Sequence, residues 1–367
     1  MPDAIKPLSG LKIVEIASIG PGPFCAMMLA DHGADVVRIE KPGGRNVGTS
    51  HFDKDPILRG RPKVELDLKD PADAAKALDL IEQADGLIEG FRPGVMERLG
   101  LGPKETQARN PALVYGRMTG WGQDGPLASA AGHDINYIAI TGALAAIGTK
   151  ESGPVPPMNL VGDFGGGGML LAFGMLAGLL QAKASGSGTV VDAAMVEGSA
   201  LLMTMPFSLK SQGLWAGGRG DNLLDGGAPF YGTYETSDGE WIALGAIEEP
   251  FWQELVQKLE LTSDLVARRY DKTCWSELRS EIAARVRSQT RDHWTGVFEG
   301  SDACFAPILT MAEAPVHPHN VARGVFEDVD GVTQPAPAPR FDGVSPATPK
   351  TDTSAHDYDD ILESWSS

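Results

Sequence analysis

The stretch LKIVEIASIGPGPFCAMMLADHGADVVRIEKP (residues 11–42) indicates the fold class. Its first eight residues are typical of a buried strand, a turn of glycine and proline leads into an apolar helix, and DVVRIEKP follows as a second strand. A strand, a helix and a strand in this order form a βαβ unit, in which the two strands run parallel. The stretch therefore predicts an α/β protein with a parallel sheet.

The strand series continues through the first half of the chain. Further strands are predicted in VELDL (64–68), DGLIEGF (85–91) and PALVYGRMTGWG (111–122). Between the first two, residues 70–84 predict a helix that Asp70 caps and Pro71 begins. We therefore expect residues 1–190 to form a large open α/β domain with nucleotide-binding architecture.

The second half of the chain has a different character. We expect a linker over 191–215, a smaller α+β domain over 216–310, and a segment over 311–367 that packs back on the large domain. Residues 226–247 alternate around the turn Ser237-Asp238-Gly239 and predict an antiparallel hairpin, with helices following to residue 298. The uncharged stretch 164–182 is rich in glycine, so we interpret it as a buried, closely packed helix rather than a membrane span.

Charge excludes some classes of function. A formal net charge of −18 argues against a nucleic-acid binder or a protein that associates stably with anionic membranes. One segment departs from this average, and it is either a solvated face or a site for a small anionic ligand. Its basic residues are Arg38, Lys41, Arg45, Lys54, Arg59, Arg61 and Lys63.

The cysteines and the N-terminus favour a cytoplasmic protein. Cys25, Cys274 and Cys304 have no metal-binding spacing and their odd number fits a reduced compartment. The first residues lack the pattern of a signal peptide. His317 and His319 are too isolated to indicate a metal site, so we expect no metal.

The motif GPGPFC (residues 20–25) after the first strand raises the alternative of a dinucleotide-binding protein. It does not meet the GxGxxG spacing, and Pro21 and Pro23 lack the backbone N–H groups that a pyrophosphate needs. We interpret the two prolines as the start of a helix.

Three places carry residues suited to acid–base chemistry: His133-Asp134 in GHDINY, Asp163 in LVGDFGGGG, and Glu248-Glu249 after WIALGAI. Each alone also has a structural interpretation, since Asp134 or Asp163 can cap a helix and a single histidine often only hydrogen-bonds. Together they suit proton removal next to a carbonyl, with His133 titrating near neutrality and a desolvated Asp163 able to act as an acid. Two such groups on opposite faces of one carbon make a racemase.

Six long motifs extend this interpretation. PGPFCAMMLADHGADVVRIEKPGG, GHDINY, PPMNLVGDFGGG, DAAMVEGSA, LDGGAPFYGTY and GAIEEPFW resemble the α-methylacyl-CoA racemases, within the family III CoA-transferase superfamily. The similarity covers essentially the whole chain in the same order. It implies a large Rossmann-like domain with a parallel sheet, a smaller α+β domain joined to it by two linkers, an interlocked homodimer and an acyl-CoA substrate. No cofactor is implied beyond the substrate's own CoA.

The resemblance also implies roles for individual residues. His133 and Asp163 match the two catalytic bases, His133 taking the proton of the 2S epimer and Asp163 that of the 2R epimer. Asp134 and Glu248 match an assisting acidic pair, with Glu248 contributed by the other subunit; Glu249 remains an alternative. The implied CoA site comprises Arg38, Lys41, Leu66, Asp67, Leu68, Lys69, Arg92, Gly132, Ile135, Asn136 and Tyr137. Lys41 stands where relatives commonly have arginine. Lysine offers a phosphate a single point charge, whereas arginine offers a planar guanidinium with several donors.

Two other functions would explain part of the sequence. A CoA-transferase of the same superfamily would use Asp163 as a nucleophile and would not need a base at His133. A non-catalytic acyl-CoA carrier would explain the basic segment but not the acid–base set. Methionines can adapt to varied acyl chains, or they can be ordinary core. The candidates are Met169, Met175, Met195, Met203 and Met205.

Overall fold

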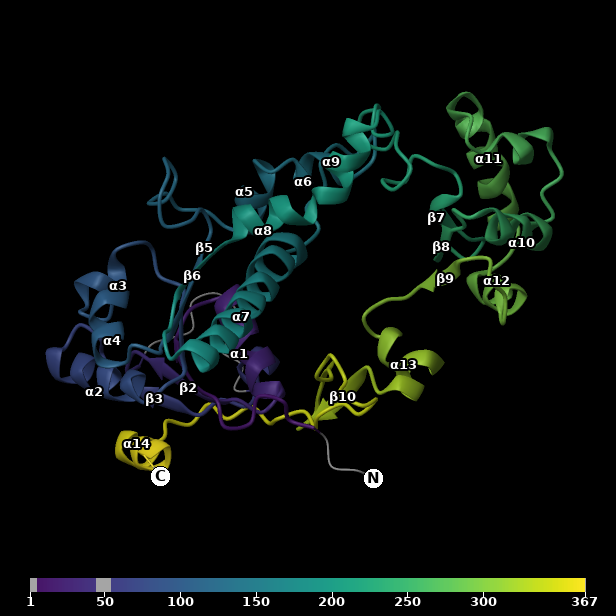
Figure 1. Ribbon diagram of the computed structural model, residues 1–367. Coiled ribbons are helices and arrows are strands. Elements are labelled where there is room, and N and C mark those ends of the chain that lie inside the picture. The colour runs from purple at the N-terminus through teal and green to yellow at the C-terminus, as the bar shows by residue number, and fades with distance from the viewer. Residues whose placement is uncertain (1–4, 44–53, 367) are drawn as a thin grey trace. The chain divides into compact units, whose positions relative to one another are not determined.

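The computed structural model describes residues 5–43 and 54–366, so Arg45 of the basic segment lies outside the described residues (Figure 1). The chain forms two compact units. The first comprises the residues through Thr141, Pro157–Met203 and those from Pro318 onward; the second comprises Gly142–Pro156 and Thr204–His317.

A six-stranded sheet forms the centre of the first unit. All its strand pairs are parallel, and the strand order is β3-β2-β1-β4-β5-β6. This confirms the predicted α/β class. The strands are β1 (Lys12–Ile16), β2 (Asp35–Glu40), β3 (Lys63–Glu65), β4 (Gly86–Glu89), β5 (Val114–Thr119) and β6 (Val190–Ala194).

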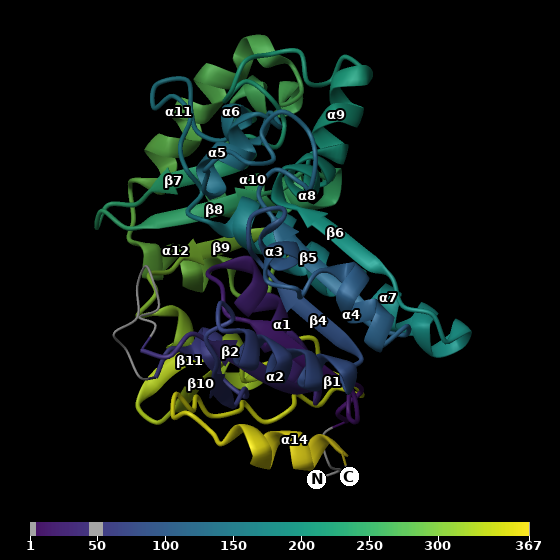
Figure 2. The ribbon, with the colours of Figure 1, turned by 90° about the vertical axis from the view of Figure 1, so that its left-hand side faces the viewer.

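Helices cover both faces of this sheet. α1 and α7 share a core with Ile13, Ile88 and Val114, while α2 and α14 pack on Val14 and Val37 from the other side. Figure 2 shows the sheet with α2 and α4 in front of it. The helical elements are α1 (Pro21–Asp31), η1 (Pro56–Leu58), α2 (Pro71–Glu82), α3 (Val95–Arg98), α4 (Pro103–Arg109), α5 (Asp134–Ala139), η2 (Leu160–Gly168), α7 (Met169–Ser185), α8 (Met195–Leu202), α13 (Pro318–Arg323) and α14 (Tyr358–Ser366).

Two predicted helix starts are confirmed. Pro21 is the first residue of α1, where its missing N–H costs no hydrogen bond. Asp70 caps α2, accepting a hydrogen bond of 2.8 Å from the Ala72 N–H, and Pro71 opens the helix.

The long apolar helix is only partly as predicted. It begins as a π-helix, η2, and continues as α7, where Gly174 and Gly178 allow close approach: a Cβ there would lie 2.5 Å from Val191 and 2.7 Å from Val114. The prediction of a buried helix is wrong for one face, which carries exposed apolar side chains. These are Met169, Phe173, Leu176 and Leu180. Among the described residues, Leu160–Ser185 is the one helix that could cross a membrane by length and composition, and 39% of its most apolar stretch is buried.

Buried ion pairs account for part of the basic segment. The Glu15 carboxylate accepts from Arg38 at 2.7 Å and from Arg61 at 2.8 Å, and all three side chains are almost fully buried. Arg59 binds Asp31 through two bonds of 2.6 and 2.8 Å. Arg59 and Arg61 therefore form structural ion pairs inside the first unit. For these two residues, both interpretations of the basic segment, as a ligand site and as a solvated face, are wrong.

The segment from Pro318 onward belongs to the first unit. Arg59 donates to Gln334 and to the Pro335 carbonyl, near the short antiparallel pair β10 (Phe326–Val329) and β11 (Val332–Pro335). In α14, the Trp365 indole donates to Asp35 at 2.8 Å.

The two compact units differ from the expected domains at all three boundaries. The second unit begins at Thr204 instead of 216 and ends at His317 instead of 310. The expected linker begins at residue 191, but β6 and α8 continue the first unit, because β6 pairs with β5 from Val190 to Ala194. Residues Gly142–Pro156, including α6 (Ala143–Ala146), cluster with the second unit instead.

The second unit contains a three-stranded antiparallel sheet, β7-β8-β9. Tyr231–Glu235 and Trp241–Gly245 form the predicted hairpin, and a cluster around Phe230, Trp252 and Trp294 forms the core beside it. Its elements are α9 (Thr204–Ser211), β7 (Tyr231–Glu235), β8 (Trp241–Gly245), α10 (Glu249–Leu259), η3 (Asp264–Arg268), η4 (Lys272–Cys274), α11 (Trp275–Val286), α12 (Arg291–Phe298), β9 (Phe305–Ile308) and η5 (Ala314–Val316).

Candidate active site

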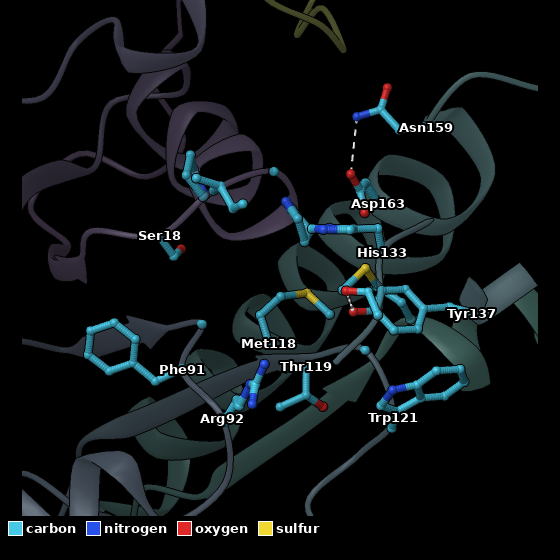
Figure 3. Close-up of a pocket in the computed structure, with 18 of the residues that line it drawn as sticks. Ser18, Phe91, Arg92, Met118, Thr119, Trp121, His133, Tyr137, Asn159 and Asp163 are labelled. Carbon is cyan, nitrogen blue, oxygen red and sulfur yellow. Dashed lines mark hydrogen bonds between the residues drawn. The ribbon is translucent and has the colours of Figure 1, made fainter. Parts of the chain in front are cut away.

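A cavity of about 740 Å³ opens at the carboxyl ends of the parallel strands (Figure 3). Its walls come from the loops after β1, β4 and β5 (residues 18–20, 90–93 and 120–133) and from α5 and η2. The strand order reverses between β1 and β4, and open α/β sheets bind their ligands at this switch point. The fold therefore places the cavity where a ligand is expected.

A second cavity of about 580 Å³ adjoins the first. Ser18, Arg38 and Phe91 line both cavities, so their walls are continuous. The second cavity brings together most of the residues predicted to bind CoA. They are Arg38, Lys41, Leu66, Asp67, Leu68 and Lys69.

His133 and Asp163 both line the first cavity. His133 is the residue before α5, and Asp163 lies in the first turn of η2. In Figure 3 their side chains lie next to one another, although the two residues belong to different helical elements. The structure thus brings the two predicted bases to one place.

The Asp163 carboxyl has no cationic arginine or lysine partner among the described residues. It accepts a hydrogen bond of 3.1 Å from the Asn159 amide and is half-buried. Its pKa is raised above the ordinary value, mainly by burial and to a lesser degree by the nearby Asp134 carboxylate. The hydrogen bond from Asn159 and the nearby His133 oppose this shift but do not cancel it. A carboxyl in this state can hold a proton closer to neutral pH.

Asp134 does not cap α5, which corrects one interpretation of its role. His133 occupies the capping position, and the buried Asp134 carboxylate accepts a 2.7 Å hydrogen bond from the Asp163 backbone N–H. The contact requires glycine at position 162, because a Cβ there would lie 2.4 Å from the Asp134 Oδ1. Asp134 therefore fixes the backbone that carries Asp163.

The loop residues predicted to bind CoA divide into two groups. Gly132, Asn136 and Tyr137 line the first cavity. Asn136 accepts from the His133 N–H at 3.0 Å, and the Tyr137 hydroxyl donates to the Gly132 carbonyl, so both hold the His133 loop. Ile135 is 43% exposed and is absent from the described wall of the cavity, because the first turn of α5 directs it elsewhere.

The cationic residues of the predicted CoA site differ in availability. Arg38 is 3% exposed and binds both Glu15 and Glu40, so it is part of the wall. Lys41 is 64% exposed with only a 3.9 Å contact to Asp67. Lys69 and Arg92 are exposed, and neither side chain makes an ion pair within the described part of the chain. The available charge thus comes from Lys41, Lys69 and Arg92.

Glu248 belongs to the second unit, where it directly precedes α10. The cavity wall among the described residues comes from the first unit alone.

Sequence reasoning missed several residues of this site. Asn159 lies four residues before Asp163, a helical spacing that could have indicated the contact. Met118 and Trp121 also line the cavity, but no pattern in β5 distinguishes them from core residues. Of the predicted methionines, Met195 lines the cavity, Met175 is fully buried, and Met169 and Met205 are exposed.

The chain is similar to known proteins over nearly its whole length. It is 44% identical to the α-methylacyl-CoA racemase of Homo sapiens, across 90% of this chain and 86% of the human protein. It is 42% identical to that of Mus musculus, across 93% and 88%. It is also 30% identical to the succinyl-CoA–D-citramalate CoA-transferase of Chloroflexus aurantiacus, across 90% and 84%.

Solved structures show the same fold. The crystal structure of Rv3272 from Mycobacterium tuberculosis superposes with a TM-score of 0.78 at 26% identity, across 95% of this chain and 96% of that one. A protein from Brucella suis with a TM-score of 0.81 is 23% identical and supports the fold alone. Residues 8–355 match the model of CoA-transferase family III, and the chain belongs to that family.

Proposed function

We propose that this protein is an α-methylacyl-CoA racemase, which interconverts 2R- and 2S-2-methylacyl-CoA thioesters. One observation carries the proposal: His133 and a half-buried Asp163 of raised pKa line the same cavity at the switch point of the sheet. The similarity to human and mouse proteins of that name supports it.

The mechanism follows from two proton carriers beside one carbon. From the 2S epimer, His133 takes the α-proton and the C–H electron pair moves onto the thioester oxygen as an enolate. Asp163 then gives its own proton to the opposite face of the carbon. The 2R epimer reacts in reverse, with ionised Asp163 as the base and protonated His133 as the acid.

The residues around Asp163 suit this exchange. Asn159 donates to Oδ2, which leaves Oδ1 to carry the transferred proton. Asp134 holds the Asp163 backbone by accepting its N–H. The N–H groups of Asp134 and Ile135 open α5 and have no acceptor among the described residues, so we assign the enolate oxygen to them. The next N–H, that of Asn136, already donates to the His133 carbonyl at 2.8 Å.

The substrate's CoA would occupy the second cavity. Its phosphates are anionic, and Lys41, Lys69 and Arg92 supply exposed positive charge near that cavity and at its junction with the first. The acyl chain would then extend into the first cavity, beside Met118 and Met195. The reaction as proposed uses no cofactor beyond the substrate's own CoA.

A homodimer is part of the proposal. On the apolar face of α7, Phe173 is 73% exposed and Leu180 is 72% exposed. Exposing apolar side chains to water is unfavourable, and a second copy of the chain packed on this face would bury them. The family resemblance assigns Glu248 to the active site of the partner subunit. Phe173→Glu should convert a dimer into a monomer in light scattering; a monomeric wild-type protein would contradict this part.

We also propose a cytoplasmic location. All three cysteines are free, Cys25 and Cys274 being buried and Cys304 exposed, which suits a reducing compartment.

CoA transfer is the second candidate, since the family is named for it and Asp163 would be its nucleophile. One experiment separates the two. The protein is incubated with an enantiopure 2-methylacyl-CoA in D₂O, with and without a free carboxylic acid. We expect deuterium at the α-carbon and loss of optical activity in both samples; absence of both, with CoA appearing on the free acid, would establish transfer instead.

A further inference from the structure

Hydrogen bonds and an ion pair hold the turn Ala246–Glu249 in the second unit. The Ala246 carbonyl accepts from Arg269 at 3.1 Å, and the Ile247 carbonyl accepts from the Tyr270 hydroxyl at 2.7 Å. The Glu249 carboxylate binds Arg269 at 2.9 Å and the Gln253 amide at 2.6 Å. Two consecutive residues, Arg269 and Tyr270, thus supply most of the contacts.

Glu248 is the exception within this turn. Its backbone carbonyl accepts from Trp252 at 3.0 Å in the first turn of α10, but its carboxylate is exposed and makes no hydrogen bond or ion pair with any described residue. A carboxylate at a helix start normally accepts from the second or third helical N–H. Pro250 is the second residue of α10 and has no N–H, so the sequence itself removes one of those donors.

Arg269 is rigid enough to act as an anchor. Its side chain is 4% exposed, and its guanidinium carbon lies 4.6 Å from the ring centre of Tyr270 and 5.3 and 5.4 Å from those of Phe230 and Trp252. Its backbone carbonyl accepts from the Trp275 indole at 2.7 Å. A cation enclosed by aromatic rings loses little freedom when it binds the turn.

We propose that Arg269 and Tyr270 are positioning residues: they fix the 246–249 turn so that the Glu248 carboxylate stays free to assist the two bases. The inference rests on the proposed function, in which Glu248 assists the two bases. It also assigns the neighbouring acids different tasks: Glu249 binds Arg269 and holds the turn, and Glu248 assists the two bases.

The main test is Tyr270→Phe, which removes one hydroxyl from a side chain that is 58% exposed. We expect kcat for epimerisation to fall about fivefold, the equivalent of one net hydrogen bond, with KM unchanged and Tm lowered no more than in the matched control. Tyr358→Phe is the matched control, because that hydroxyl also donates to a backbone carbonyl, at 3.2 Å in the first unit. The control should keep the wild-type kcat.

Arg269→Lys is the second variant, with Arg285→Lys as its control. Arg285 likewise contacts a backbone carbonyl, a glutamate and an aromatic ring, those of Leu259, Glu260 and Trp294. We expect Arg269→Lys to lower kcat more than Tyr270→Phe does, and Arg285→Lys to leave kcat unchanged. Glu249→Gln should lower kcat less than Glu248→Gln.

A double-mutant cycle separates positioning from general damage. If Tyr270 acts through Glu248, Tyr270→Phe should have no further effect on kcat in a Glu248→Gln background. A full fivefold effect in that background, or wild-type kcat in Tyr270→Phe itself, would overturn the inference. Wild-type kcat in Glu248→Gln would also overturn it, while the racemase proposal would stand as long as His133→Ala and Asp163→Asn abolish epimerisation.

Discussion

Asp31 and Asp163 are both carboxylates inside the first unit, and they differ in what surrounds them. Asp31 is 4% exposed and meets the Arg59 guanidinium through two parallel bonds. Asp163 is half-buried and meets one neutral amide, that of Asn159, with a second carboxylate nearby. A paired cation stabilises a buried negative charge, whereas a carboxylate without one tends to hold its proton. The first arrangement serves stability and the second suits chemistry.

The largest effect should come from removing the reactive carboxyl. Asp163→Asn keeps the shape of the side chain but cannot exchange a proton, so racemisation should fall about 10³-fold, within the range for loss of general acid–base catalysis. The measurement is the rate of epimerisation by chiral analysis. Asp31→Asn, assayed per folded molecule, should retain its rate. Equal rates for Asp163→Asn and wild type would remove the distinction between the two carboxyls.

Removing the structural carboxyl should reduce stability instead. Asp31→Asn leaves the buried Arg59 charge without its partner, and we expect the free energy of unfolding in urea to fall by about 3–5 kcal/mol. Asp330→Asn is the matched control, since its pair with Lys350 is exposed and should contribute less than about 1 kcal/mol. Similar losses in the two variants would show that burial does not matter to the Asp31–Arg59 pair.

The pH dependence of stability should reveal the burial of the Asp163 carboxyl. Because burial raises the pKa of Asp163 in the folded protein, its ionisation opposes folding at neutral pH, and this penalty disappears as the pH falls below the ordinary value of 3.8. Asp163→Asn should therefore be more stable than wild type at pH 7, with the advantage lost in acid. Denaturation curves at several pH values test this, and a difference that stays constant with pH would contradict it.

The smallest effect should come from an exposed charge at the second cavity. Lys41 is 64% exposed, so Lys41→Ala should raise KM for the acyl-CoA by about two- to threefold without changing kcat. The difference from wild type should shrink as salt screens the interaction. An unchanged KM at low salt would place the phosphates elsewhere.

Local sequence signals predicted much of the fold. Pro21 begins α1, Asp70 caps α2, and the turn at Ser237–Gly239 closes the hairpin, because each of these features depends on residues adjacent in the chain. The end of the first unit was harder to predict, because β6 is defined by its pairing with β5, about 75 residues earlier in the chain. No local pattern distinguishes such an edge strand from a linker.

The same division holds for the candidate site. The acid–base residue types in GHDINY and LVGDFGGGG indicated proton transfer, and the family resemblance indicated which residues pair. The contact between Asp134 and the Asp163 N–H could not be predicted from spacing, because it depends on how α5 and η2 pack at a glycine. For the same reason, the sequence could not show that Arg59 and Arg61 are buried structural cations.

Sequence by itself therefore determined the fold class, the starts of several helices and the chemical nature of the candidate residues, since these follow from local backbone preferences and side-chain chemistry. Only the tertiary structure decided which charges are paired and which are free. Burial and the proximity of a partner control the energy of a charge, and both arise from contacts between segments far apart in the chain. That is why Asp31 and Asp163, alike in chemistry, differ in role.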